Sequence, residues 1–331
     1  MRPGERDGTR RWRAIGLRLA AIVFGVAAGT LLLEAAARIA IPEDVAQLRL
    51  PGYWFEPSDV PGIPFLLRPN ADGWTNNLGL RNPRDVALQK APGTFRLLVV
   101  GDSVSSLRTD GVSPEPLYPN LLEDLLKARL DVPVEVLNLS SPGLSTDQEL
   151  ALIRARGLPL QPDLIVIAYA ANDSIRTDID TAANVEPHWL LPVRLLRLWS
   201  YRRQGKSADE WYRADTLQRL DATFGDLARL AAEHPVVVVP LPVRNADRAQ
   251  QIHLEPVAEL CRRHGLRCLD IYPRMVPYLS GLNPGETTDL LHYDSAGHRA
   301  LADALADPLA AVIAERDSAH MEGAAPPAPV E

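Results

Sequence analysis

The chain has 331 residues, 46% of them apolar and 23% charged, which are the proportions of a globular protein rather than a fibrous or wholly disordered one. Forty-two acidic residues outnumber 35 basic ones. The resulting net charge of −7 argues against a broad basic face, so no nucleic-acid partner is expected. The only two cysteines, Cys261 and Cys268, exclude a disulfide-rich scaffold and a four-cysteine zinc site.

The N-terminal segment combines a basic part with an apolar part. Residues 1–18 hold six arginines, and residues 19–33 contain no charged side chain. We expect a transmembrane helix over 19–41, because about 20 apolar residues cross a bilayer. The alternative is a cleaved signal peptide with its cleavage site at the alanines 35–37. In both cases the arginines stay in the cytoplasm and the remainder of the chain is exported, so the anchored form is a single-pass cell-membrane protein.

Residues 42–94 are rich in Pro, Asn and Gly and predict a loop-rich lead-in. After the lead-in, short apolar runs alternate with segments of helical spacing. The predicted strands are 95–100, 134–139, 163–169, 235–241 and 267–272, and the predicted helices are 117–130, 146–156, 215–233, 246–264 and 295–316. This alternation predicts an α/β fold with a parallel sheet that helices cover on both faces.

Capping residues and two irregular segments complete this prediction. We expect Gly265 to end the helix before it and Asp294 to cap the helix after it. An insertion over 174–214 follows the third strand and contains three tryptophans and His188. We expect this insertion either to lie over the binding face or to pack on the domain without contacting a ligand. We expect His188 to contact either substrate or solvent. Residues 317–331 are rich in Ala, Pro and Glu and predict a disordered tail.

Chemically useful residues follow four of the predicted strands, and ligands bind at the carboxyl ends of such strands. Ser103 follows the first strand, Gly143 the second, Asn172 the third, and the pair Asp289 and His292 the fifth. In our interpretation Ser103 is a nucleophile, His292 its base and Asp289 the acid that orients the base. The N–H groups of Ser103 and Gly143 and the amide of Asn172 are candidate donors to an oxyanion.

Neighbouring polar residues have simpler interpretations. Asp102 is expected to stabilise the turn before the serine, and Ser105 and Ser106 to start a helix. His298 is the main rival base, but the nearest acid, Asp294, is already assigned as a cap. The histidines lack the spacing of a metal site, so neither a metal nor another cofactor is expected.

The two cysteines bracket a predicted helix end and strand start. They form a disulfide if their Cα atoms come within about 5.5 Å. We favour two buried free thiols, because a helix residue and a residue of the neighbouring strand often point apart.

The four blocks, in this order, resemble the SGNH hydrolases, also called GDSL esterases and lipases. The resemblance covers 95–316 and implies a flavodoxin-like three-layer α/β/α sandwich. It also implies that Ser103, Asp289 and His292 form a catalytic triad and that Ser103, Gly143 and Asn172 form the oxyanion hole. The lead-in segment 75–81 is similar to one in membrane-anchored bacterial members. Ala170 stands where the family usually has glycine.

These observations together predict a serine esterase on the outer side of the cell membrane. The resemblance suggests O-acetyl esters of cell-envelope or secreted polysaccharide as substrates, and a site tethered at a bilayer also suits lipid esters. An O-acyltransferase would use the same acyl-enzyme. A non-catalytic module that binds glycan or a membrane partner through the aromatic insertion is the third alternative. The oligomeric state stays open.

Overall fold

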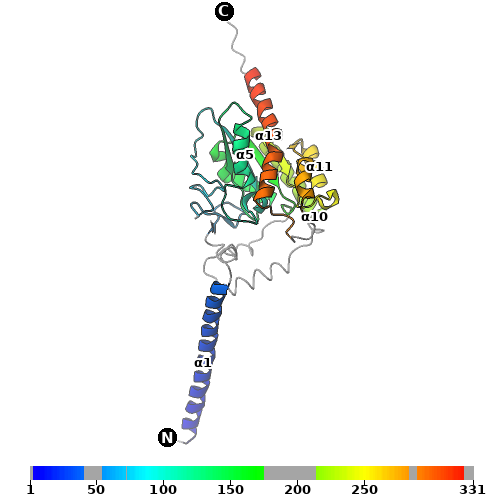
Figure 1. Cartoon of the computed structure of the whole chain (residues 1–331). Helices are drawn as coiled ribbons and strands as arrows, with labels where there is room; N and C mark the ends of the chain where they lie inside the picture. The colour runs from blue at the N-terminus through cyan, green and yellow to red at the C-terminus, as the bar shows by residue number, and fades with distance from the viewer. Residues whose placement is uncertain (1–2, 41–53, 72, 175–213, 283–288, 324–331) are drawn as a thin grey trace, which may run out of the picture. The chain divides into compact units, whose positions relative to one another are not determined.

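The computed structural model describes residues 3–40, 54–71, 73–174, 214–282 and 289–323 (Figure 1). It divides into two compact units. The described part of the first unit is helix α1 (Pro3–Ala40), and the second contains 53–182 and 206–331. The greater part of the predicted insertion, with His188, lies outside the described residues.

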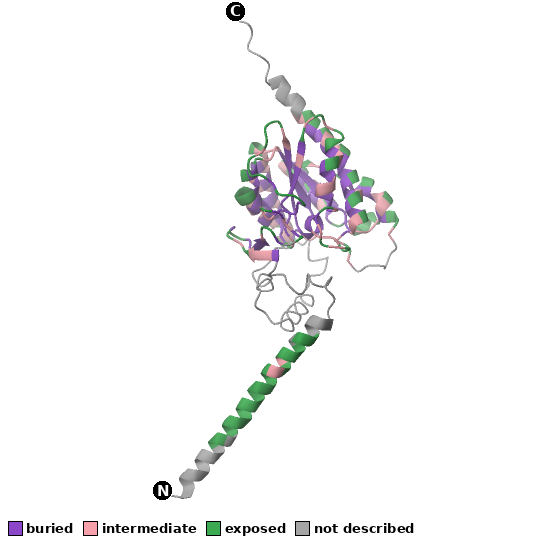
Figure 2. Ribbon diagram, turned by 60° about the vertical axis from the view of Figure 1, so that its left-hand side comes forward, coloured by how far each residue is buried: buried purple, intermediate pink, exposed green. Residues whose placement is uncertain are grey.

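Helix α1 carries a candidate membrane span at Ile15–Leu33, with a mean hydropathy of 2.0 and no buried residue (Figure 2). A helix of this length and composition near the N-terminus suits a membrane anchor or a signal sequence. The helix is continuous from Pro3, so the arginines from Arg6 to Arg18, which we assigned to a separate segment, belong to the same helix.

The second unit is built on a five-stranded parallel sheet with the order β4-β3-β5-β6-β7. The strands are β3 (Phe95–Gly101), β4 (Val134–Asn138), β5 (Leu164–Tyr169), β6 (Val236–Pro240) and β7 (Arg267–Cys268). Strand β3 pairs with β4 on one side and β5 on the other. The strand order therefore reverses at β3, and such a switch point is where open α/β sheets bind ligands.

Two apolar cores cover the two faces of the sheet, which confirms the three-layer α/β/α sandwich. Along β3, Leu97 and Val99 enter one core while Leu98 and Val100 enter the other, because alternate side chains of a strand point to opposite faces. The first core packs against α5 (Tyr118–Lys127), α12 (Tyr272–Ser280) and α13 (Ser295–Gly323). The second packs against α6 (Thr146–Leu152), α10 (Ala214–Glu233) and α11 (Leu254–His264).

The described part of the lead-in contains a small sheet, in which β1 (Phe55–Pro57) pairs antiparallel with β2 (Phe65–Leu67). Its later residues cover the free edge of β4. The Asn82 side chain donates to Val136 O (2.8 Å) and accepts from Asn138 N (2.9 Å). It therefore pairs with backbone groups of β4 to which a neighbouring strand would otherwise bond.

Element ends differ from the predictions at four places. The fifth strand is only two residues long, because Asp270 accepts the N–H of Tyr272 and starts helix α12, which the sequence analysis missed. The predicted helix 246–264 begins at Leu254, after a 3-10 turn η4 (Arg248–Gln250). Helix α6 continues as a π-helix η2 (Ile153–Gly157) and a 3-10 turn η3 (Leu158–Leu160). Helix α13 continues to Gly323, so the predicted disordered tail is helical at its start.

Both predicted caps are confirmed, and the expectation of free thiols is wrong. Gly265 ends α11 with a φ of 64°, and Asp294 Oδ1 accepts the N–H of Gly297 (2.8 Å) at the start of α13. The left-handed turn at Gly265 brings β7 back beside the last turn of α11. Cys261 and Cys268 therefore lie 6.1 Å apart between Cα atoms and form a disulfide.

Candidate active site

Ser103 stands at the first position of a short helix α4 (Ser103–Ser106), directly after the buried strand β3. Asp102 caps this helix, as its Oδ1 accepts the N–H of Val104 (2.8 Å). Gly101 permits the tight exit from the strand, because a Cβ there would lie 2.8 Å from Ser105 Oγ and 3.0 Å from Ala168 O. The expectation that Asp102 stabilises this turn is confirmed.

His292 and Asp289 reach the serine from the loop before α13. Ser103 Oγ lies 2.8 Å from His292 Nε2, and His292 Nδ1 lies 2.8 Å from Asp289 Oδ2. The second carboxylate oxygen of Asp289 accepts the N–H groups of Leu291 and His292, each at 3.0 Å. These four contacts hold the carboxylate, the imidazole ring and the hydroxyl together in series.

The electrostatics of this pair suit a base near neutral pH. Burial alone would raise the pKa of Asp289, but the hydrogen bond and charge of His292 and the two backbone donors lower it to about 2. Burial alone would lower the pKa of His292, but Asp289 and the charge of Asp102 hold it above its ordinary value. Asp289 is therefore ionised whenever His292 exchanges a proton.

Arg244 supports the Asp-His loop from the end of β6. Its Nη1 donates to the carbonyl oxygens of His292 (3.1 Å) and Asp289 (3.4 Å), and its own N–H donates to Leu290 O (2.7 Å). The sequence analysis missed this residue. Its position just after a predicted strand, on the same sheet edge as the other site residues, was the available signal.

The Asn172 amide is held beside the serine by Asp102. Asn172 Nδ2 donates to Asp102 Oδ2 (2.8 Å), and the same oxygen lies 3.2 Å from Ser103 Oγ. Hydrogen bonds thus connect Asp289, His292, Ser103, Asp102 and Asn172 in series. One of the two amide protons of Asn172 is used in this series, and the other is available to a ligand.

Gly143 lies in the loop after β4, exposed and with a φ of 81° that favours glycine. Two backbone hydrogen bonds hold this loop to the neighbouring blocks. Ser141 N donates to Gly101 O (3.0 Å), and Thr146 N donates to Asp173 O (3.4 Å). The structure therefore brings the glycine loop to the same edge of the sheet as Ser103 and Asn172.

Two buried carboxyl groups under the site were also missed. Asp173 Oδ2 accepts the N–H of Ala170 (2.8 Å) and closes the turn that carries Asn172. Glu149 of α6 is fully buried, and within the described part of the chain neither of its carboxyl oxygens has a hydrogen-bond partner. Burial raises the pKa of both groups well above ordinary values. The charges of Asp102 and Asp147 act in the same direction on Glu149, and those of Glu149 and Asp102 do so on Asp173, so both groups favour the neutral form.

The rival base, His298, is occupied by backbone groups. Its Nδ1 accepts the N–H of Tyr118 (3.2 Å), and its Nε2 lies 2.9 Å from Leu107 O. Burial lowers its pKa to about 4, so the ring is neutral and structural at neutral pH. Ser105 and Ser106 lie in α4 as expected, bonded to Tyr118 Oη and Asp102 O.

Arg81 of the lead-in braces the nucleophile helix. The buried guanidinium lies 4.3 Å from the ring centre of Trp74 and donates to that residue's carbonyl oxygen. It also donates to Ser106 O (2.8 Å), at the end of α4, and to Val112 O (2.9 Å). Residues outside the four blocks therefore fix the helix that begins with Ser103.

The model of the GDSL-like lipase/acylhydrolase family matches residues 99–300, which contain all of these blocks. The chain belongs to this family. GDSL-like acylhydrolases cleave ester bonds, and the chain is accordingly an ester-bond hydrolase. Among the described residues, no group of three His, Cys, Asp or Glu side chains could hold a metal ion.

Solved structures similar to this one include three esterases or hydrolases. Axe2, an acetylxylan esterase from Geobacillus stearothermophilus, is 17% identical over 64% of this chain and 92% of its own, with a TM-score of 0.42. LAE5, an α/β hydrolase from the metagenome of Lake Arreo in Spain, is 18% identical over 66% and 95%, with a TM-score of 0.45. The lipase/acylhydrolase of Enterococcus faecalis is 19% identical over 66% and 96%, with a TM-score of 0.41. No curated protein sequence matches the chain.

Proposed function

We propose that this GDSL-like hydrolase is a serine esterase in which Ser103 is the nucleophile, His292 the general base and Asp289 the acid that orients it. The observation that carries the proposal is the line of two 2.8 Å contacts from Asp289 through His292 to Ser103. A hydroxyl is a weak nucleophile until a base takes its proton, and His292 Nε2 is within hydrogen-bond distance of that proton.

The reaction has two halves. His292 Nε2 accepts the proton of Ser103 as Oγ attacks the ester carbonyl carbon, and the carbonyl oxygen becomes an oxyanion. The intermediate collapses, His292 gives its proton to the departing alcohol, and an acyl-enzyme ester remains on Ser103. Water then attacks this ester while His292 accepts a proton, and the carboxylic acid leaves as the serine is regenerated.

Three donors would stabilise the oxyanion in both halves. They are the N–H groups of Ser103 and Gly143 and the second amide proton of Asn172. Asp102 fixes the Asn172 amide before the substrate arrives, and a fixed donor needs no reorganisation during the reaction. Removal of one such donor costs about a hundredfold or more in turnover, so Asn172→Ala tests this role.

We further propose that the enzyme acts outside the cytoplasmic membrane on O-acetyl esters of cell-envelope or secreted polysaccharide, or on lipid esters. The support is the apolar, unburied span of α1 after a segment with six arginines, because basic residues that flank a span favour the cytoplasmic side. A reporter that is active only in the periplasm, fused after Glu331, should be active. Activity of a cytoplasmic reporter alone would contradict this orientation.

Rapid quenching with p-nitrophenyl acetate tests the esterase mechanism. Wild-type protein should show an acetyl adduct on the peptide that contains Ser103, and Ser103→Ala should show neither adduct nor turnover. Ser280→Ala is the matched control, since Ser280 is exposed at the end of α12. Full turnover by folded Ser103→Ala would refute the proposal. Acetylated sugar in place of acetate, in the presence of a sugar acceptor, would identify an O-acyltransferase.

A further inference from the structure

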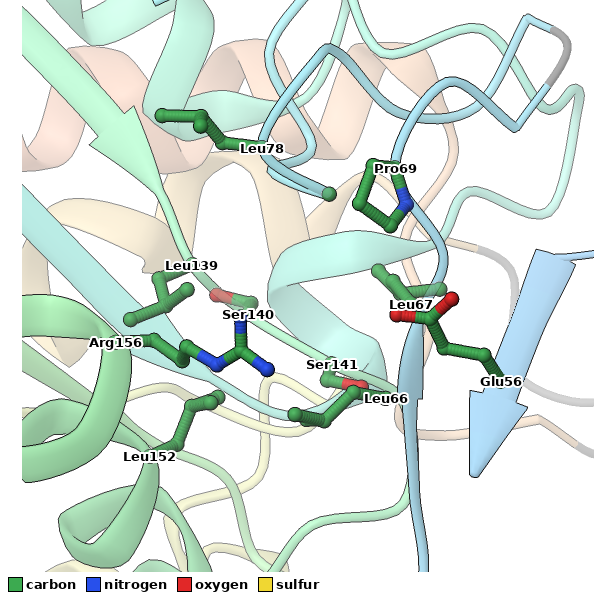
Figure 3. A pocket seen from close by; sticks show the side chains of 11 residues that line it. Glu56, Leu66, Leu67, Pro69, Leu78, Leu139, Ser140, Ser141, Leu152 and Arg156 are labelled. Carbon is green, nitrogen blue, oxygen red and sulfur yellow. The ribbon is translucent and has the colours of Figure 1, made fainter. Parts of the chain in front are cut away.

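A small pocket that is open to solvent lies between the lead-in and the loop that follows β4 (Figure 3). Strand β2 and the segment after it form one side, and α6 and η2 form the other. Leucines line its walls, namely Leu66, Leu67, Leu78, Leu139 and Leu152. Figure 3 shows Glu56 and Arg156 pointing into this pocket from opposite sides.

Two serine hydroxyls on the pocket wall have no hydrogen-bond partner within the part of the chain that the structure describes. They belong to Ser140 and Ser141, which are 1% and 2% exposed. The backbone of both residues is fixed, because Ser140 N donates to Asn138 Oδ1 (3.2 Å) and Ser141 N to Gly101 O (3.0 Å). Buried hydroxyls are nearly always paired, and because these two have no partner among the described residues, they are candidates to pair with a bound group.

The loop after β4 contributes residues both to this pocket and to the proposed active site. Gly143 stands two residues after Ser141, and Ser103 stands two residues after Gly101, to which Ser141 is bonded. The two residues of chain from Gly101 to Ser103 span at most about 7 Å. The hydrogen bond between Ser141 and Gly101 keeps the Cα atoms of these two residues within about a further 7 Å, and the Cα atoms of Ser141 and Ser103 are therefore at most roughly 14 Å apart. An ester that carries one or two sugar rings spans this distance.

We propose that this pocket is a sugar subsite for the alcohol half of the ester, an inference that rests on the proposed function. The polar groups on the pocket wall indicate which half of the ester, the acyl chain or the alcohol, the pocket binds. An alkyl chain would fill the space between the leucines but would leave both serine hydroxyls unpaired. A sugar ring offers hydroxyls to the serines and C–H faces to the leucines, and small numbers of polar groups among apolar walls are typical of ligand pockets.

The charged groups at the pocket suit the same ligand. Arg156 projects from the π-helix η2, a type of helix that is frequent at functional sites. Its Nη2 donates to Asp59 of the lead-in (2.6 Å), and this contact orients the guanidinium. Arg156 supplies only donors and Glu56 only acceptors, so together they pair with hydroxyls of either orientation.

The experiment compares two acetyl esters, mono-O-acetylated cellobiose and p-nitrophenyl acetate, with the full-length enzyme in detergent. We expect Ser140→Ala and Ser141→Ala each to lower the ratio of the two kcat/KM values, sugar ester over p-nitrophenyl ester, about fivefold. This corresponds to about 1 kcal/mol for one neutral hydrogen bond. The loss should appear in the KM for the sugar ester, because a binding contact remote from the reacting carbonyl acts on both ground and transition states.

Arg156→Ala should lower the same ratio, whereas Arg154→Ala should not. Arg154 lies in the same π-helix, is exposed and does not line the pocket, so it controls for charge. An unchanged ratio in the serine variants, or an equal loss on both esters, would overturn the sugar subsite. The proposed function fails separately, if Ser103→Ala hydrolyses p-nitrophenyl acetate at the wild-type rate.

Discussion

Replacement of Asp289 by asparagine tests how the base is oriented, because it changes one atom and keeps the shape. The two carboxylate oxygens have different tasks. One accepts two backbone N–H groups at 3.0 Å, and the other accepts His292 Nδ1 at 2.8 Å. In Asp289→Asn the amide oxygen should stay on the backbone donors, so the amide nitrogen faces His292 Nδ1. The ring proton then moves to Nε2, which can no longer accept the proton of Ser103.

Two contributions set the size of this effect. To restore the productive tautomer the amide must flip and give up two backbone hydrogen bonds, which costs about 2 kcal/mol. The variant also loses the charge that stabilises the imidazolium. A pair near 4 Å is worth about 4 kcal/mol at a protein surface. The Asp289 side chain is 41% exposed, so we halve this to about 2 kcal/mol to allow for solvent screening. Together, about 4 kcal/mol corresponds to a loss of roughly a thousandfold in kcat.

The pH profile of p-nitrophenyl acetate hydrolysis checks the same reasoning independently. Asp289 holds the pKa of His292 above its ordinary value against burial, which acts in the opposite direction. The acidic limb of kcat/KM reports this group in the free enzyme, so it should move to lower pH in Asp289→Asn. A variant that keeps more than a tenth of the wild-type kcat, or an acidic limb that does not move, would refute the reasoning.

Three further predictions concern the scaffold. Both Gly79 and Gly93 have a φ of 75°, but only at Gly79 would a Cβ meet a backbone oxygen, 2.7 Å away. Gly79→Ala should therefore lower the free energy of unfolding in urea more than Gly93→Ala, and equal losses would count against this. His298→Ala should destabilise the fold and keep kcat within about tenfold, whereas His292→Ala should lower kcat at least about a thousandfold; the reverse order in the esterase assay would make His298 the base. Burial raises the pKa of Glu149 above its ordinary 4.5. As the pH rises above 4.5, the unfolded chain releases the proton of this carboxyl group while the folded chain keeps it, so the free energy of unfolding of the wild type falls. Glu149→Gln should therefore raise Tm more at pH 8 than at pH 5, and equal shifts would contradict this.

The sheet could be predicted because its strands are buried on both faces. Runs such as 95–100 and 163–169 are almost wholly apolar, and their alternation with helical segments is sufficient for an α/β architecture. The fifth strand was overpredicted for the opposite reason. It lies at the edge of the sheet, pairs over two residues and gives way to α12, where Asp270 accepts the N–H of the first helical residue, Tyr272.

The proposed triad and the Asn172 block follow strands, so their position at one sheet edge was predictable from chain order. The residues that hold them were not. Arg81 and Arg244 act on backbone carbonyls far away in sequence, and nothing in their own neighbourhoods indicates those partners. A glutamate in a helix, such as Glu149, usually faces solvent. Its burial depends on the packing of α6 against the sheet, which the local sequence does not indicate. The disulfide likewise depends on the turn at Gly265, whose direction the spacing of the cysteines does not reveal.

Labelling with a fluorophosphonate, which reacts with activated serines, tests most directly whether Ser103 is the nucleophile. The full-length protein, Ser103→Ala and the control Ser280→Ala are treated in parallel, and the labelled peptide is identified by mass spectrometry. The wild type and Ser280→Ala should each carry a single label on Ser103, and Ser103→Ala should carry none. A folded wild type that does not react, or a Ser103→Ala variant that still reacts and hydrolyses ester, would contradict this role of Ser103.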